Sequence, residues 1–114
     1  MSECVFCQIV AGTLPSSIVA ESEHAVAFRD VAPHAKVHVL VVPRAHVDSA
    51  DELTGEDAHL AGELVLLAQK VAEIEGVRES GYRLVMNVGP DALMSVPHLH
   101  LHVLGGQQLH GRLA

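Results

Sequence analysis

Apolar residues in the first half of the chain follow the short alternating patterns that are typical of β-strands. The predicted strands span residues 18–21, 25–29 and 37–42. The first two would pair as a hairpin around Glu23 and His24, and the third is expected to be an internal strand that ends before Pro43. Its alternation places His38 on the same face as Leu40.

The middle of the chain carries a helical pattern instead. Residues 54–57, Thr-Gly-Glu-Asp, resemble a helix N-cap, and Gly76 ends the pattern that follows them. The apolar positions between these signals recur at spacings of three and four: Leu60, Leu64, Leu67, Val71 and Ile74. This spacing predicts one long amphipathic helix that covers one face of a sheet.

Two more strands and a short helix complete the predicted elements. The strands are expected at residues 82–88 and 99–104, and the helix at residues 4–11, where Gly12 would stop it. The resulting order is helix, strands, long helix, strands. It predicts a single α+β domain over residues 1–114, with about five strands in a largely antiparallel sheet.

Composition narrows the possible functions. The formal charge of −7 argues against a protein that coats DNA or RNA, because nonspecific phosphate binding relies on clustered Lys and Arg. The longest apolar runs are far too short for a membrane-spanning helix, and no secretory signal is readable, so we expect a cytoplasmic protein. Nine histidines in 114 residues are unusual, and imidazoles serve as metal ligands, nucleophiles and proton shuttles near neutral pH.

Three of these histidines alternate with apolar residues in the segment His98-Leu99-His100-Leu101-His102-Val103. In a strand the three imidazoles would share one face and the apolar side chains the other. A single histidine on a sheet is usually a surface residue, but three at a strict period of two favour a chemical role. A catalytic metal site is one alternative, although the first and third residues of the set would lie about 13 Å apart on one strand and the site would need further ligands.

This segment resembles the hallmark of the histidine triad nucleotide-binding family, His-x-His-x-His followed by two apolar residues. Other segments match the family in order and spacing, so the resemblance covers nearly the whole chain and is closest to the Hint-like branch. These segments are residues 4–6, 27–30, 38–46 and 86–89. The resemblance implies the family's fold, and a small homodimer whose protomers join their sheets.

The resemblance also implies a chemistry. Family members cleave a nucleoside monophosphate from an amine, a phosphate or another leaving group, and the residue matching His100 is the nucleophile on the α-phosphorus. A backbone carbonyl near His98 would fix the tautomer of His100. His102 and Ser95 match positions that stabilise the phosphoryl oxygens, and Ser95 also matches the proton donor to the leaving group.

Family resemblance further suggests where a purine mononucleotide would bind. Asp30 matches a carboxylate that holds the ribose hydroxyls, which suits a vicinal diol. Asn87 matches a residue near the phosphate, and His38 one beneath the triad. The remaining matches are apolar walls around the base: Val5, Phe6, Ile9, Phe28, Val31 and Leu40.

The two cysteines, Cys4 and Cys7, could present two thiolates from one helical turn, and zinc held by two Cys and two His is a common structural site. Some bacterial triad proteins join such a pair to the first triad histidine and to a histidine near the position of His46. By this resemblance the zinc ligands are Cys4, Cys7, His46 and His98. A redox dithiol and simple buried thiols are the competing interpretations.

The chain departs from the family pattern at two places. Leu93-Met94 stands where the family usually has Gly-Gln before the triad serine, which removes a hydrogen-bond donor to the phosphate or leaving group. Residues 107–114 lack the aromatic ending of eukaryotic Hint proteins. We therefore expect a purine nucleoside phosphoramidase, or more broadly a nucleotide hydrolase or nucleotidyl transferase. The alternatives are a dinucleoside polyphosphate hydrolase and a zinc-stabilised nucleotide-binding module with little catalysis.

Overall fold

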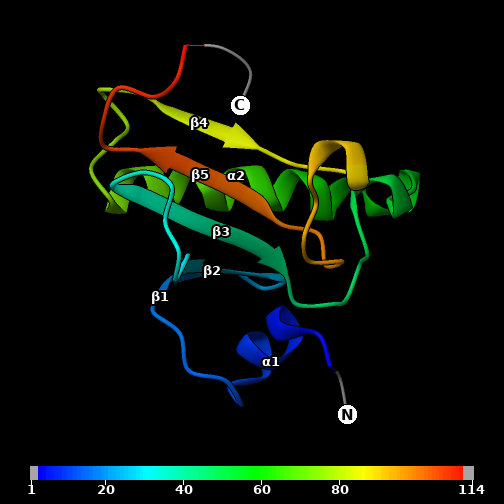
Figure 1. The fold of residues 1–114 in the computed structure, drawn as a ribbon. Helices are drawn as coiled ribbons and strands as arrows, with labels where there is room; N and C mark the ends of the chain where they lie inside the picture. The colour runs from blue at the N-terminus through cyan, green and yellow to red at the C-terminus, as the bar shows by residue number, and fades with distance from the viewer. Residues whose placement is uncertain (1–2, 112–114) are drawn as a thin grey trace.

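A five-stranded antiparallel sheet with strand order β1-β2-β3-β5-β4 organises the chain (Figure 1). The computed structural model describes residues 3–111, so both ends of the predicted domain over 1–114 lie outside the described residues. The strands are β1 (Ile18–Glu21), β2 (Ala25–Arg29), β3 (Val37–Pro43), β4 (Tyr82–Val85) and β5 (Leu101–Gly105). The helices are α1 (Val5–Ala11) and α2 (Ala58–Ile74), and short 3-10 turns span Ala50–Glu52, Gly55–Asp57 and Pro90–Ala92. The predicted α+β architecture is confirmed.

The central strand β3 is buried on both faces, which explains its continuous run of apolar residues. Val39 and Val41 pack into the cluster that includes α2, whereas Leu40 and Val42 pack with Phe6 of α1. The alternation predicted for this strand is confirmed. Helix α2 lies behind the sheet in Figure 1, and α1 lies at the β1–β2 end.

Helix α2 begins later than its N-cap signal suggested. Thr54 and Asp57 do form a capping box, but it caps a 3-10 turn over Gly55–Asp57, and the α-helix starts at Ala58. Leu64 and Val71 are fully buried, yet Ile74 is 49% exposed. Ala68 and Ala72 are also fully buried on the face of α2 that packs against the sheet. Ile74, three residues beyond Val71, lies at the edge of that face.

Each of the two C-terminal strands is shorter than predicted at the end that lies near the triad. The strand predicted at 82–88 ends at Val85, and the strand predicted at 99–104 begins at Leu101. Leu99 donates its N–H to the carbonyl of Val47 over 2.6 Å, so the backbone before Leu101 bonds to a loop rather than to a strand. The predicted faces nevertheless hold, because Leu99, Leu101 and Val103 all pack in the α2-side core.

Candidate functional site

His98 and His100 are buried and joined by a backbone contact. His100 donates its Nδ1–H to the carbonyl of His98 over 2.7 Å, and the ring of Phe6 packs edge-on against it with centroids 5.1 Å apart. Since Nδ1 carries the proton in this bond, the lone pair lies on Nε2. The carbonyl that the family resemblance assigned to this role is therefore that of His98 itself.

A second hydrogen-bond chain orients His102. The backbone N–H of His34 donates to His38 Nδ1 over 3.0 Å, which places the His38 proton on Nε2. His38 Nε2 lies 2.9 Å from His102 Nδ1 and 3.4 Å from an Asp30 carboxylate oxygen. His102 Nδ1 is thus the acceptor, and His102 Nε2 carries a proton. Among the described residues this buried Nε2 has no hydrogen-bond partner.

Burial keeps the inner imidazoles neutral. It lowers the pKa of His102 to about 4, with His100 and His38 adding to the effect and Asp30 opposing it. Burial also lowers the pKa of His38 and of His98, although Asp30 opposes the first shift and the Pro43 carbonyl the second. At neutral pH His38, His98 and His102 are therefore neutral.

These lowered pKa values predict that acid destabilises the fold. Between the ordinary imidazole pKa of 6.5 and the value of about 4 for His102, the unfolded chain binds a proton that the folded protein does not. The free energy of unfolding should therefore fall as pH falls through this window. Urea unfolding at several pH values should show a shallower dependence for His102→Gln than for the wild type. His59→Gln, which changes an exposed residue, should keep the wild-type dependence, and equal slopes for all three would contradict the prediction.

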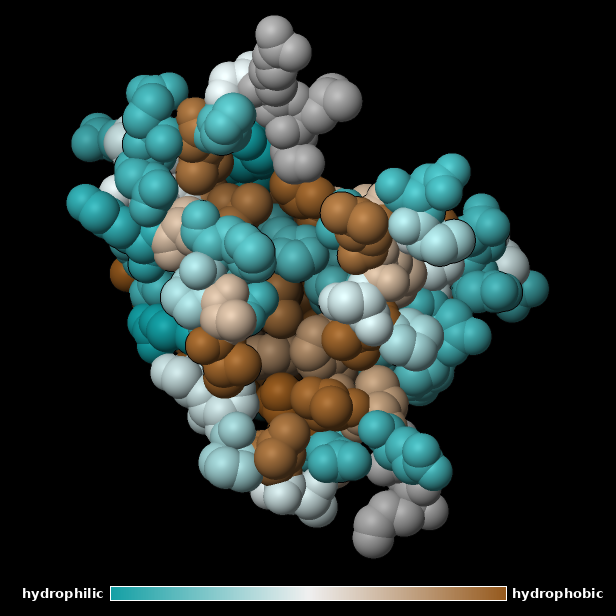
Figure 2. Space-filling view, in the orientation of Figure 1, coloured by the Kyte–Doolittle hydropathy of each residue, from teal (hydrophilic) through white to brown (hydrophobic). Residues whose placement is uncertain are grey.

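Two cavities meet at Asp30 on the face away from α2, where Figure 2 shows apolar residues gathered in a hollow between polar margins. The first cavity has a volume of about 240 Å³ and its lining is mostly apolar. The predicted residues that line it are Val5, Phe6, Ile9, Phe28, Asp30, Val31 and Leu40. The second has a volume of about 500 Å³, and its lining includes Asp30, His38, Asn87, Ser95, His100 and His102.

The structure thus brings together all of the predicted binding and catalytic residues except His98, which lines neither cavity. Phe6 and Phe28, which both line the smaller cavity, pack edge-to-face with centroids 5.4 Å apart. Asp30 accepts the N–H of Ala32 at one carboxylate oxygen over 2.8 Å. Its other oxygen faces His38, which leaves lone pairs on both for a ligand.

The four predicted metal ligands, Cys4, Cys7, His46 and His98, form a separate cluster. Their ligand atoms all lie within 4.8 Å of one another, and three Sγ to Nδ1 distances are 3.3, 3.3 and 3.5 Å. A tetrahedral zinc ion holds sulfur and nitrogen ligands about 3.5 Å apart, so the spacing fits. The outer Nε2–H of each imidazole also donates to oxygen, His98 to Pro43 and His46 to Asp48. This second contact is typical of metal-bound histidine.

Several groups that orient the site residues were not predicted from the sequence. The carbonyl of Pro43 and the N–H of His34 act through the main chain, so no side-chain pattern indicates them. The side chain of His34 offered no signal either, although this exposed residue also lines the larger cavity. Asp48, two residues after His46, was the one detectable signal, because a nearby carboxylate commonly orients a ligating imidazole.

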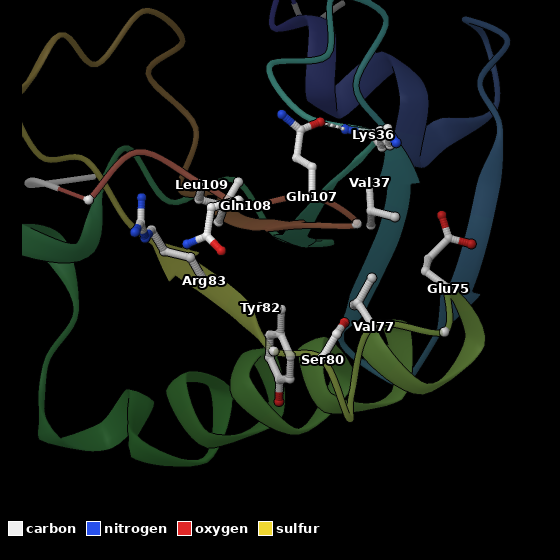
Figure 3. A pocket seen from close by; sticks show the side chains of 14 residues that line it. Lys36, Val37, Glu75, Val77, Ser80, Tyr82, Arg83, Gln107, Gln108 and Leu109 are labelled. Atoms are coloured by element: carbon white, nitrogen blue, oxygen red, sulfur yellow. Dashed lines mark hydrogen bonds between the residues drawn. The ribbon is translucent and has the colours of Figure 1, made fainter.

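A further cavity of about 790 Å³ lies beside the C-terminal end of α2 (Figure 3). Its wall includes Tyr82, Arg83 and Gln107, and the backbone N–H of Lys36 donates to the Gln107 side chain over 2.7 Å. None of the predicted site residues lines it. The chemistry-bearing residues therefore belong to the two smaller cavities and the adjoining Cys/His cluster.

Comparison with solved structures identifies the fold. A HIT family hydrolase from Clostridium thermocellum superposes with a TM-score of 0.96 at 39% identity, covering 100% of this chain and 99% of that one. A HIT family hydrolase from Legionella pneumophila gives a TM-score of 0.92 at 38% identity, covering 96% and 97%. With at least 96% of each chain covered, the fold is that of these hydrolases.

Sequence comparison leads to the same family. The purine nucleoside phosphoramidase of Escherichia coli is 37% identical over 112 residues, covering 98% of this chain and 94% of that protein. An uncharacterized HIT-like protein of Synechococcus elongatus is 44% identical over 110 residues, covering 96% of each. The HIT domain model matches residues 11–109. With the triad histidines, their hydrogen bonds and these matches taken together, the chain belongs to the HIT family.

Proposed function

We propose that the protein is a purine nucleoside phosphoramidase that works through a covalent nucleotidyl intermediate on His100. The observation that carries this proposal is the 2.7 Å bond from His100 Nδ1 to the carbonyl of His98, which leaves an unprotonated Nε2 on a residue lining the larger cavity. An imidazole in this tautomer attacks without first losing a proton. The similarity to the Escherichia coli phosphoramidase suggests the substrate class.

In the proposed first step, His100 Nε2 attacks the α-phosphorus, and the bond from phosphorus to the leaving nitrogen breaks. The departing amine takes the proton of the Ser95 hydroxyl, which lines the same cavity, and solvent reprotonates that oxygen. Water then attacks the phosphorus and loses a proton to solvent, the bond from phosphorus to Nε2 breaks, and the nucleoside monophosphate departs. Throughout, the His98 carbonyl accepts the Nδ1–H and stabilises the positive charge that develops on the ring.

The nucleotide would lie across the junction of the two cavities. The base occupies the smaller, apolar cavity against Phe6 and Phe28, and Asp30 accepts hydrogen bonds from the ribose diol. Val5, Ile9, Val31 and Leu40 complete the walls around the base. The phosphate then falls in the larger cavity among the histidines. An apolar cavity of about 240 Å³ has room for a single base.

His102 is the proposed donor to a phosphoryl oxygen. Its Nε2–H is buried without a partner, which is costly unless a ligand supplies an acceptor. The chain from the His34 N–H through His38 holds this proton on Nε2 in advance of binding. Asn87 and Ser95 line the same cavity and offer further donors. We assign His38 to orienting His102 rather than to contacting the substrate.

We further propose that Cys4, Cys7, His46 and His98 hold a structural zinc ion. All four ligand positions are filled by the protein in this arrangement, so the ion would stabilise the fold and bind no substrate. It would join α1 to the loop after β3 and to His98. The position of the His98 carbonyl, and with it the His100 tautomer, would then depend on the ordering of this cluster.

Assembly as a homodimer through β4 is also proposed. Among the described strands β4 has β5 on one side only, and Leu84 and the nearby Val88 are 37% and 41% exposed. Sedimentation equilibrium should give twice the chain mass for the wild type and a lower mass for Leu84→Lys. A wild-type monomer would contradict this assembly.

No helix within residues 3–111 is long and apolar enough to span a bilayer. We further propose that the protein is cytoplasmic and consists of one domain.

Turnover of adenosine 5′-phosphoramidate tests the proposed function. The wild type should release adenosine monophosphate and ammonia with steady-state kinetics. The alternative binding module would bind adenosine monophosphate in isothermal titration but would release no product from the phosphoramidate. Diadenosine polyphosphates should be poorer substrates. A higher kcat/KM for them would favour a dinucleoside polyphosphate hydrolase instead.

A further inference from the structure

Leu93 has an unfavourable backbone and an exposed apolar side chain beside the catalytic histidines. Among residues 3–111 it is the one residue other than glycine with a positive φ, at φ 61° and ψ 35°. This left-handed conformation is rare for bulky L-residues. Its side chain is also 84% exposed. Strain of this kind at a cavity wall is a reason to look for function.

The turn that contains Leu93 is well held, so its conformation is built into the fold. The N–H of Leu93 donates to Pro90 over 3.0 Å and the N–H of Met94 donates to Gly89 over 3.2 Å. These bonds close the 3-10 turn over Pro90–Ala92 and hold Leu93 at its end. A glycine or asparagine would meet this geometry at less cost. The leucine side chain therefore contributes nothing that the turn itself requires.

Leu93 lies where the group released from the phosphorus would sit. It lines the larger cavity together with Ser95, His100 and His102, while the base cavity lies on the other side of Asp30. With the nucleoside in the base cavity and the phosphate at the histidines, the space left beside Leu93 and Ser95 falls to the leaving group. Ala92, Val85 and Leu104 add apolar surface to the same cavity.

We infer that Leu93 selects a leaving amine that carries an apolar chain. This inference rests on the proposed phosphoramidase function and names the class of amine. The reaction is unchanged: His100 Nε2 bonds to phosphorus, the P–N bond breaks, and the alkylamine leaves with a proton relayed by Ser95. Contact with Leu93 removes apolar surface of both partners from water as the amine chain settles against it.

The test uses two adenosine 5′-phosphoramidates that differ only in the end of the amine chain, hexylamine and 5-aminopentanol. The two amines have nearly the same length and basicity, so their difference reports polarity alone. The wild type should give a kcat/KM about five to ten times higher for the hexyl substrate, in line with the usual value of an apolar contact at a pocket. Unsubstituted adenosine 5′-phosphoramidate serves as the reference.

Three substitutions separate the side chain from the backbone. Leu93→Asn tolerates the left-handed conformation with a polar side chain of similar size, and Leu93→Gly removes the side chain. Both should bring the ratio of the two substrates close to one, because neither variant offers the apolar contact. Leu93→Met should retain the wild-type ratio. Thermal melting should show Leu93→Gly to be at least as stable as the wild type, because the strain is relieved.

The outcomes distinguish this inference from the proposed function beneath it. If the wild type turns over none of the three substrates, the phosphoramidase function fails and the inference fails with it. If all are turned over but the wild-type ratio is near one, or Leu93→Asn leaves the ratio unchanged, only the assignment of Leu93 is overturned. A lower sedimentation mass for Leu93→Asn would also overturn it, since Leu93 would then be a contact between subunits.

Discussion

Replacing His100 with alanine is expected to lower kcat/KM for adenosine 5′-phosphoramidate by about ten-thousand-fold, because loss of a covalent nucleophile removes the reaction path itself. The wild type, quenched during turnover, should show a mass increase of one adenylate, and the variant should show none. The adduct should map to the peptide containing His100, whose Nδ1 is held by the His98 carbonyl.

Alanine at this position also leaves the buried His98 carbonyl without its donor, which alone costs about 1–3 kcal/mol of stability. His100→Asn is therefore the companion variant, since its amide can still donate to that carbonyl. It should melt near the wild type and be equally inactive. His59→Ala, on the exposed side of α2, is the matched control and should retain full activity. Full turnover by His100→Asn would show that the covalent mechanism is wrong.

Loss of zinc should have the largest effect on stability. Cys7→Ser, and the wild type after chelation, should lose a stoichiometric zinc ion and melt about 10–15 °C lower, the equivalent of roughly 3 kcal/mol in a domain of this size. kcat should fall about tenfold, because His98 contacts both thiols and supplies the carbonyl that orients His100. Zinc content by plasma mass spectrometry, melting temperature and kcat are the three measurements.

Adding zinc back distinguishes a metal site from a purely structural pair of thiols. Chelated wild type should recover its melting temperature and kcat on titration with one equivalent of zinc, whereas Cys7→Ser should not. A Gln69→Ser substitution, made in α2 away from the cluster, should change neither property. Purified wild type that contains no zinc and is indifferent to added zinc would rule out the proposed metal.

The fold could be predicted because its core residues carry the period of their elements. Val39, Val41, Leu64 and Val71 appear in the sequence with the alternation and helical spacing that they obey in the structure. The limits of the elements were less predictable, since they depend on distant partners. Leu99 continues the strand pattern, but its N–H bonds to Val47, and nothing near Leu99 in the sequence indicates that contact.

The candidate site was predictable only where side chains carry it. The His-x-His-x-His spacing and the cysteine pair pointed to residues that the structure brings together. The family resemblance pointed to a carbonyl near His98, but the carbonyl of Pro43 and the N–H of His34 were not visible, because they belong to a main chain that every residue shares. The positive φ of Leu93 was hidden for a related reason: a leucine in a sequence gives no sign of a left-handed backbone.

Helix α1 has a consequence for how two ligands would influence each other. This seven-residue helix carries Cys7 toward the metal-ligand cluster and Phe6 and Ile9 toward the base cavity, with Cys4 at its N-cap. A helix of two turns is marginal by itself and becomes ordered through what it contacts. A metal and a nucleotide would share the entropy cost of ordering α1, so each would raise the affinity for the other by the same factor. Metal supply would then set nucleotide affinity as well as thermal stability.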